Sequence, residues 1–145
     1  MSKKSRTKGH SYEREVAQTL NEAFYLADLP IKLQRDLSQY QERDRGDLVG
    51  LEDYGFVIEC KRYAKGNKPL TAWWDQVTTA ADYQNAIPLL IYRFDRMQSE
   101  VQFPLMMFIT EDEHQPEFNE YFVRMDFDKF LHPFISYIKA KHEQS

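Results

Sequence analysis

The sequence has little cysteine, no clustered histidines and no long apolar run, which several classes of protein require. Its single cysteine, Cys60, excludes both an internal disulfide and a cysteine zinc cage. Its four histidines are scattered without ligand spacing, and we find no glycine-rich phosphate loop, nucleophilic serine motif or internal repeat. No apolar run approaches the length of a membrane span, and no signal peptide opens the sequence. We therefore expect a reduced, soluble, cytoplasmic protein without a membrane partner.

What remains is the composition of an ordinary globular domain. The 145 residues are 42% hydrophobic and 29% charged, which is enough for a buried core. We expect a basic arm at residues 1–10, either flexible and near DNA or simply a solvated terminus, and a single domain at 11–145. The net charge is −4, yet residues 1–68 hold 13 Lys and Arg against 11 Asp and Glu, whereas the rest hold 6 against 12. The first half could therefore present a local basic surface to phosphates.

Residues 46–62 carry the most informative pattern. They read as two short apolar strands joined by a polar turn that ends in Gly55. Because strand side chains alternate between faces, Glu59 and Lys61 must share one face. A three-residue loop ending at Gly55, with that glycine in the left-handed region, would place Asp47 opposite Lys61 and on the face of Glu59. A two-residue loop would put Asp47 on the other face, and the glycine favours the first arrangement.

Asp47 and Glu59 would then bring two carboxylates together. A magnesium ion binds hard oxygen ligands, keeps several waters and needs only one or two protein carboxylates. The alternative is a surface hairpin whose acids and lysine form a weak ion-pair patch. Spacing alone leaves both interpretations open.

A helix is expected from Ser11, which offers a hydroxyl at the cap position. With Val16 at zero and about 100° per residue, the apolar side chains fall in one arc. Glu13 falls inside that arc, whereas Glu15 falls outside it. An inward carboxylate needs an arginine, a lysine or a metal ion as its partner. The alternative is that Glu13 lies at the end of the helix and reaches solvent.

The periodicity of the remaining chain predicts an α/β fold with a central mixed sheet of about five strands, flanked by helices. Further strands are expected at 31–37, 88–94, 103–109 and 120–125, and helices at 71–84 and after Asp126. Pro133 should kink or restart the last helix. Trp73 and Trp74 lie about 100° apart on their helix, so we expect one to be buried and the other at a rim or a partner surface.

Several basic residues are candidates for phosphate contacts. Three of them, Arg35, Arg43 and Arg45, either bind phosphate or merely offset the acids next to them in the sequence, Asp36, Glu42 and Asp44. The candidates are Lys3, Lys4, Arg6, Lys8, Arg35, Arg43, Arg45, Arg62 and Lys65.

Three motifs resemble those of one family. Residues 8–16, Lys-Gly-His-Ser-Tyr-Glu-Arg-Glu-Val, are similar to the Lys-Gly-x-x-x-Glu-Arg-Glu-Leu opening of archaeal-type Holliday junction resolvases. Residues 46–49, Gly-Asp-Leu-Val, and 58–61, Ile-Glu-Cys-Lys, resemble the second and third motifs of that family, within the PD-(D/E)XK nuclease superfamily. The resemblance covers residues 8–94. The aromatic tail beyond is longer than expected and suggests a viral, phage or bacterial member rather than an archaeal one. A viral member would act in the cytoplasm of its host.

The resemblance implies a restriction-endonuclease-like core and a metal-dependent endonuclease that resolves four-way DNA junctions as a homodimer. The implied catalytic residues are Glu13, Asp47, Glu59 and Lys61. Asp47, Glu59 and the backbone carbonyl of Cys60 would hold Mg²⁺ or Mn²⁺, and Glu13 would serve a second ion. Trp73, Trp74 and the tail would fill the dimer interface.

Three other interpretations remain. A repair or restriction-type endonuclease of the same superfamily would cut ordinary duplex, and a non-catalytic DNA-binding module would keep the acids for structure alone. A nuclease that acts on RNA is equally compatible with these residues.

Overall fold

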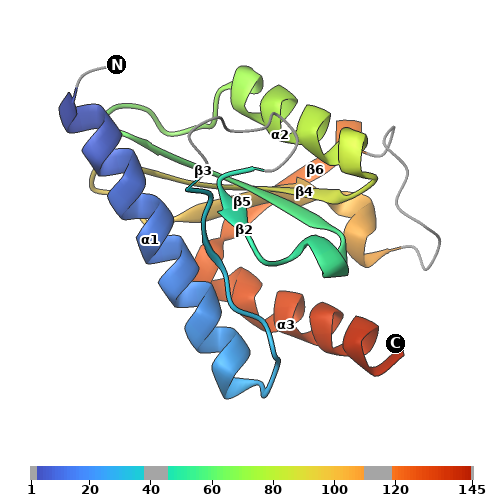
Figure 1. Ribbon diagram of the computed structural model, residues 1–145. Coiled ribbons are helices and arrows are strands. Elements are labelled where there is room, and N and C mark those ends of the chain that lie inside the picture. The colour runs from blue at the N-terminus through green and yellow to red at the C-terminus, as the bar shows by residue number, and fades with distance from the viewer. Residues whose placement is uncertain (1–2, 38–45, 110–118, 145) are drawn as a thin grey trace.

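A mixed β-sheet forms the centre of the molecule and carries helices on both faces (Figure 1). The structure, a computed structural model, describes residues 3–37, 46–109 and 119–144. Within these ranges the strands, in their order across the sheet, are β1 (Gln34–Arg35), β2 (Leu48–Val49), β3 (Phe56–Tyr63), β4 (Ile87–Phe94), β5 (Glu100–Pro104) and β6 (Phe122–Asp126). The helices are α1 (Lys3–Leu26), α2 (Thr71–Gln84) and α3 (Phe127–Gln144). This architecture confirms the expected α/β class.

The two longest strands, β3 and β4, run parallel through the middle of the sheet. Their sequences are largely apolar, as expected for strands that are covered on both faces. Parallel neighbours need a crossover connection, and α2 supplies it. All other neighbouring strands pair antiparallel. The helix predicted at 71–84 and the strand predicted at 88–94 are both confirmed.

Alternation along β3 divides the hydrophobic core into two parts. Phe56, Ile58 and Cys60 belong to the larger part, which also contains apolar residues of α1 and α3. Val57 belongs to the smaller part, which lies beneath α2. Figure 1 shows α2 over one face of the sheet and α1 and α3 across the other. The prediction that Glu59 shares a face with Val57 therefore places its carboxylate on the α2 side of the sheet.

The first helix begins earlier than the sequence suggested. It starts at Lys3 rather than Ser11, so residues 3–10, expected to form a flexible arm, are helical. Contacts across the fold anchor this end of α1. The Nζ atom of Lys8 lies 2.8 Å from Oδ1 of Asp95, and the Tyr12 hydroxyl donates to Oγ of Ser99 over 2.8 Å. These partners follow β4, far along the chain, and sequence periodicity does not reveal them.

The apolar run at 103–109 does not form the strand predicted there. Strand β5 begins earlier, at Glu100, and ends at Pro104, after which residues Leu105–Phe108 form a short 3₁₀ helix, η2. Of the η2 residues only Met107 is buried. An apolar run by itself does not separate a strand from a helical turn, which explains the error.

Other element ends differ less from expectation. Strand β1 covers two residues of the seven predicted at 31–37. Strand β6 is displaced by a residue or two from the predicted 120–125. Helix α3 continues through Pro133 without restarting, although proline removes one helical hydrogen bond. None of the helices in the described ranges is long and apolar enough to cross a bilayer.

Both tryptophans of α2 are buried, against the expectation that only one would be. Trp73 is 5% exposed and Trp74 is 7% exposed. The indole N–H of Trp74 donates to the carbonyl oxygen of Asn119 over 3.1 Å, and its ring centroid lies 5.5 Å from that of Phe122. A distant part of the chain therefore covers the side of α2 that the sequence left open, so burial of Trp74 does not need a second protein chain.

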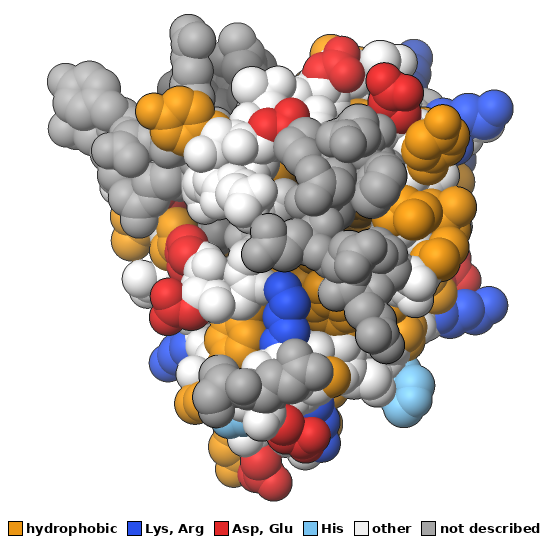
Figure 2. All heavy atoms as spheres, turned by 90° about the vertical axis from the view of Figure 1, so that its right-hand side faces the viewer, with side chains coloured by type: hydrophobic (Ala, Val, Ile, Leu, Met, Phe, Trp, Pro, Cys, Tyr) orange, Lys and Arg blue, Asp and Glu red, His pale blue; other side chains and the backbone are white. Residues whose placement is uncertain are grey.

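Apolar side chains are exposed near the end of β5. Figure 2 shows hydrophobic side chains among charged ones on the side of the molecule that lies to the right in Figure 1. Around η2 the exposed large apolar residues are Leu105, Phe108, Ile109, Tyr121 and Phe122. Isolated exposed apolar residues are ordinary on protein surfaces, and a group of five is less so.

Candidate active site

The hairpin of β2 and β3 brings Asp47 next to Glu59. Leu48 pairs with Ile58, and the same register carried one residue further sets Asp47 opposite Glu59 rather than opposite Lys61 as predicted. The two registers differ by two residues, so both put Asp47 and Glu59 on one face of the sheet. The predicted clustering of the two acids is therefore present although the predicted pairing is wrong.

A glycine and main-chain hydrogen bonds hold Asp47 against β3. Gly46 has φ +75°, and a Cβ atom there would lie 2.6 Å from the carbonyl oxygen of Ile58. This close approach lets the backbone N–H of Asp47 donate to the same carbonyl over 2.8 Å. The Asp47 carboxylate accepts a hydrogen bond of 2.8 Å from the backbone N–H of Cys60. The position before the aspartate thus requires a residue without a side chain.

Glu59 is the most deeply buried acid of the site. Its residue is 5% exposed, and its Oε1 accepts a long hydrogen bond of 3.4 Å from the side-chain amide of Gln76 on α2. Its Oε2 is buried and has no hydrogen-bond partner. Burial and the neighbouring Asp47 carboxyl with its negative charge raise the pKa of Glu59 far above its ordinary value, and the charge of Lys61 opposes this rise. The pair would gain from a cation beside it.

Glu13 points inward, as its helical phase predicts. Its side chain is 14% exposed and its Oε2 accepts a hydrogen bond of 2.8 Å from Nε of Arg35 on β1. The side chain of Glu15 is 56% exposed and lies at 3.5 Å from Arg93. Burial raises the pKa of Glu13, the bond from Arg35 lowers it, and the charge of Asp47 raises it again. The partner that an inward carboxylate needs is therefore an arginine, and Glu13 lies within electrostatic reach of Asp47.

The three acids do not form a closed metal cage. Across the described ranges no three His, Cys, Asp or Glu side chains converge on a point where they could hold an ion. Asp47 and Glu59 form a pair, which suffices for magnesium because that ion keeps several of its waters. The N–H of Cys60 points toward Asp47. Because the N–H and the carbonyl of one strand residue point to the same neighbouring strand, the carbonyl of Cys60 also faces the strand side on which Asp47 lies. Two carboxylates, one of them with an unpartnered oxygen, and a backbone carbonyl are hard oxygen donors that suit Mg²⁺ or Mn²⁺.

Lys61 follows the acids on the same strand face. Its side chain is half-buried, and within the described part of the chain it makes no ion pair with an acid. Its charge is nevertheless felt at Glu59, whose pKa it lowers. A lysine in this position is available to an anionic ligand.

Three of the predicted phosphate-binding residues are engaged by acids of the protein itself. Arg35 pairs with Glu13. Lys8 and Arg62 both pair with Asp95, and their hydrogen bonds hold the pKa of that carboxyl below its usual range. For Arg35 the sequence suggested neutralisation by the neighbouring Asp36 as the alternative, and its partner is remote along the chain instead.

The other candidates are distributed differently. Lys65 is exposed in the loop after β3. The remaining positions have no described side chain: Lys3, Lys4 and Arg6 belong to the first turns of α1, and Arg43 and Arg45 lie outside the described residues.

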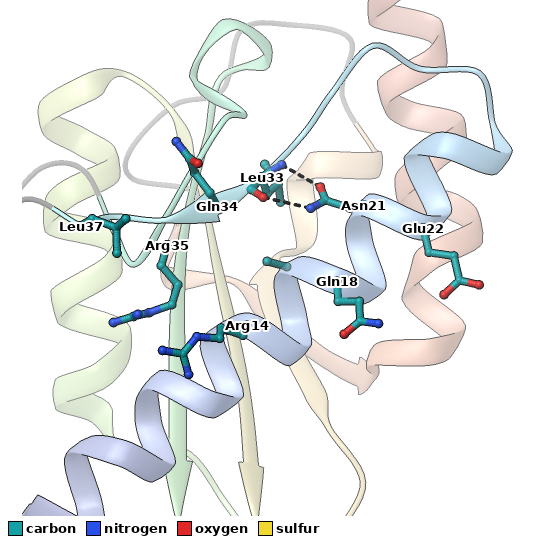
Figure 3. Close-up of a pocket in the computed structure, with 9 residues that line it drawn as sticks. Arg14, Gln18, Asn21, Glu22, Leu33, Gln34, Arg35 and Leu37 are labelled. Carbon is teal, nitrogen blue, oxygen red and sulfur yellow. Dashed lines mark hydrogen bonds between the residues drawn. The ribbon is translucent and has the colours of Figure 1, made fainter.

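Sequence reasoning missed the groove beside the site. The groove has a volume of about 690 Å³ and is lined by residues of α1 and by the segment that contains β1. Figure 3 shows Arg14 and Arg35 side by side at one end of the groove. At the other end, the side-chain amide of Asn21 donates to the carbonyl of Leu33 over 2.9 Å and accepts from its N–H over 2.7 Å. Asn21 thus holds the β1 segment, and with it Arg35, against α1. It is one polar residue among many on an amphipathic helix, which is a weak signal in sequence.

Sequence reasoning also missed Gln76. Its position on α2 shows no distinguishing pattern, and only the approach of α2 to β3 brings it to Glu59.

Comparison with known proteins gives one family match. Residues 4–135 match a family described as "Phage putative PDDEXK endonuclease". No curated protein matches the sequence. Among solved structures, one that resembles the chain is Hjc, a Holliday junction resolvase from the archaeal hyperthermophile Archaeoglobus fulgidus, with 18% sequence identity, a TM-score of 0.46 and 88% of each chain covered.

Proposed function

The chain belongs to the family of phage PDDEXK endonucleases, and from this membership we propose that it hydrolyses phosphodiester bonds of branched DNA with a divalent metal ion held by Asp47 and Glu59. The observation that supports metal dependence is the Oε2 atom of Glu59. This atom is buried without a hydrogen-bond partner, and Glu59 lies next to a second carboxyl group, that of Asp47. Burying such a group is costly unless a cation or a donor compensates it.

Each site residue has a proposed role in the hydrolysis. Asp47, Glu59 and the carbonyl of Cys60 bind Mg²⁺ or Mn²⁺, which when bound supplies Lewis acidity to the phosphate and lowers the pKa of a water ligand. Lys61 stabilises the attacking oxygen or the charge that develops on the phosphate. Gln76 fixes the rotamer of Glu59 through its hydrogen bond.

Glu13 has a different role from the second-ion ligand that the sequence suggested. One of its oxygens already accepts a hydrogen bond from Arg35. A second ion would compete with that guanidinium, so we assign Glu13 the task of holding Arg35 at the edge of the site. Arg35 can then approach a phosphate of the bound strand without leaving its partner.

The four-way junction is the proposed substrate because residues 8–16 resemble the opening motif of junction resolvases. Resolution needs two cuts in opposed strands, whereas one chain offers a single pair of carboxylates. A homodimer is therefore proposed, and its interface is not assigned to Trp73 or Trp74, which are buried within the chain. Action in the host cytoplasm stays a prediction from the sequence.

The deciding experiment measures nicking of an end-labelled four-way junction and of linear duplex of the same sequence, with Mg²⁺, with Mn²⁺ and with EDTA. Wild type should nick the junction in either metal, and Glu59→Gln should not. Glu15→Gln is the matched control because it removes an exposed glutamate of α1 that faces away from the site.

Each outcome separates the interpretations. Equal cutting of the duplex supports a repair or restriction-type enzyme and contradicts the junction substrate. Cutting of an RNA junction in preference to DNA points to an RNA nuclease. A wild type that never cuts, and that binds junctions as well as Asp47→Asn does, is a binding module and contradicts the proposal.

A further inference from the structure

A column of aromatic rings runs from the core to the surface beside the site. The ring of Tyr92 lies 6.1 Å from that of Phe94, Phe94 lies 5.8 Å from Trp73 at an interplanar angle of 27°, and Trp73 lies 4.8 Å from Tyr63. The inner three residues are at most 5% exposed, whereas Tyr63 is 43% exposed. The column therefore ends in a ring that is supported from beneath and open to solvent.

The exposed ring belongs to the strand that carries the site. Tyr63 is the last residue of β3, and alternation puts it on the same face as Glu59 and Lys61. Two residues along a strand correspond to about 6.6 Å, so Tyr63 is the next side chain beyond the lysine. A ligand whose phosphate meets Lys61 would bring its neighbouring groups to this ring.

The surroundings hold Tyr63 in place. The guanidinium of Arg62 donates to the carbonyl oxygen of Tyr63 over 2.9 Å. In the loop that follows, Gly66 packs closely against Phe94: its φ is +134°, and a Cβ atom there would lie 2.6 Å from that ring. The indole of Trp73 supports the ring of Tyr63. A ring fixed in this way loses little conformational entropy when it binds a ligand.

Positive charge lies in the loop that follows the ring. Lys65 and Lys68 are exposed in the same loop, and neither forms an ion pair within the part of the chain that the structure describes. Exposed aromatic rings among cations are the features by which proteins bind single-stranded nucleic acid, because every base has a face that can stack. Base pairs inside a regular duplex are already stacked on their neighbours and do not offer that face.

From this arrangement we propose that Tyr63 is a stacking platform for an unpaired nucleobase next to the phosphate that is cut. The inference rests on the proposed nuclease function and narrows its substrate to DNA with an unstacked base at the cleavage point. Such bases occur where strands part, as at a fork or a branch. If Tyr63 only shielded Trp73 from water, a leucine at this position would serve equally well.

The test compares Tyr63→Phe, Tyr63→Leu and Tyr63→Ala in DNA binding. The probes are a forked DNA with 2-aminopurine at the first unpaired position and a fully paired duplex of matched length, in Ca²⁺ to prevent cutting. Tyr83→Ala is the matched control, because Tyr83 is 81% exposed and lies at the far end of α2 from Trp73.

Tyr63→Phe should bind the fork as wild type does, whereas Tyr63→Leu and Tyr63→Ala should bind it roughly 5- to 150-fold more weakly, the range for loss of one base–aromatic stack. Binding to the duplex should change little in all three variants. The fluorescence of 2-aminopurine should be quenched by wild type and by Tyr63→Phe only. Thermal unfolding of Tyr63→Leu, which keeps an apolar cover over Trp73, separates binding from folding.

Fork binding by Tyr63→Leu that equals wild type, or equal loss on fork and duplex, contradicts the stacking role. Both results leave cleavage by wild type intact, so they are distinguishable from failure of the proposed function, in which wild type itself does not cut.

Discussion

Replacing Glu59 by glutamine should make the metal-free protein more stable while abolishing its activity. The substitution keeps the shape of the side chain, replaces a buried carboxyl group next to Asp47, and supplies an amide N–H₂ that can donate to the Asp47 carboxylate. In wild type the Oε2 atom of Glu59 is buried without a hydrogen-bond partner. A buried polar group left in this condition costs about 1–3 kcal/mol, and more if it is charged. The variant should recover a stabilisation of that order.

Thermal and urea unfolding in EDTA measure this difference. For a chain of this size about 1 kcal/mol corresponds to roughly 2–4 °C, so the melting temperature of Glu59→Gln should rise by roughly 2–12 °C. Added Mg²⁺ should stabilise wild type by about 2.7 kcal/mol when the free ion is at about 100 times its Kd. The variant, which has lost a ligand, should show little or none of this gain. Glu15→Gln should behave as wild type in both buffers.

Two results would refute this reasoning. If Glu59→Gln unfolds at a lower temperature than wild type in EDTA, the buried carboxylate is not a source of instability. If Mg²⁺ stabilises wild type and Glu59→Gln equally, the ion binds elsewhere and the assignment of Glu59 as its ligand is wrong.

Three further substitutions test how the site is held. Gly46→Ala should destabilise the protein by more than about 1 kcal/mol and reduce cleavage strongly, because the added methyl meets the Ile58 carbonyl at a positive φ. Urea unfolding measures the first effect and a nicking assay the second. Unchanged stability and cleavage would show that the hairpin tolerates a shift. Asn21→Ala should cost about 1–3 kcal/mol through its two lost bonds to Leu33, and an unchanged unfolding midpoint would contradict this. Gln76→Ala should raise the Mg²⁺ concentration for half-maximal cleavage about 10-fold or more while leaving the melting temperature nearly unchanged; the same metal requirement as wild type would remove Gln76 from the site.

The strand and helix patterns near the site were predictable because local periodicity decides them. Alternation along β3 correctly separated Glu59 from Cys60, and helical phase correctly separated Glu13 from Glu15. Both inferences depend only on which face a residue occupies, and tertiary contacts do not alter that within a regular element.

The pairing of the hairpin was not predictable because contacts remote in sequence decide it. Leu51 is 2% exposed, and Gly50 approaches the Lys32 carbonyl so closely that a Cβ atom there would lie 2.5 Å from it. These contacts end β2 at Val49, and a 3₁₀ turn, η1 (Glu52–Tyr54), completes the connection. Gly55 does adopt the left-handed conformation expected of it, yet the longer connection shifts the register by two residues.

The partners of the charged residues could not be predicted from the sequence either. Arg35 was expected to neutralise a neighbouring acid or to bind phosphate, and it pairs with Glu13 across 22 positions instead. The cover over Trp74 comes from Asn119, 45 positions away. Charge and amphipathicity indicate that a partner is needed, but only the packing of the elements determines which residue it is.

Cys60 stands between Glu59 and Lys61, and only its main chain contacts the proposed site. Its N–H fixes the Asp47 carboxylate, while its thiol is buried on the opposite side of the sheet among residues of α1. A substitution at this position would therefore be limited by the volume available under the helix and not by the proposed hydrolytic chemistry. Cys60 is the single cysteine of this sequence, and its burial between the sheet and the helix shields its sulfur from oxidants in solution.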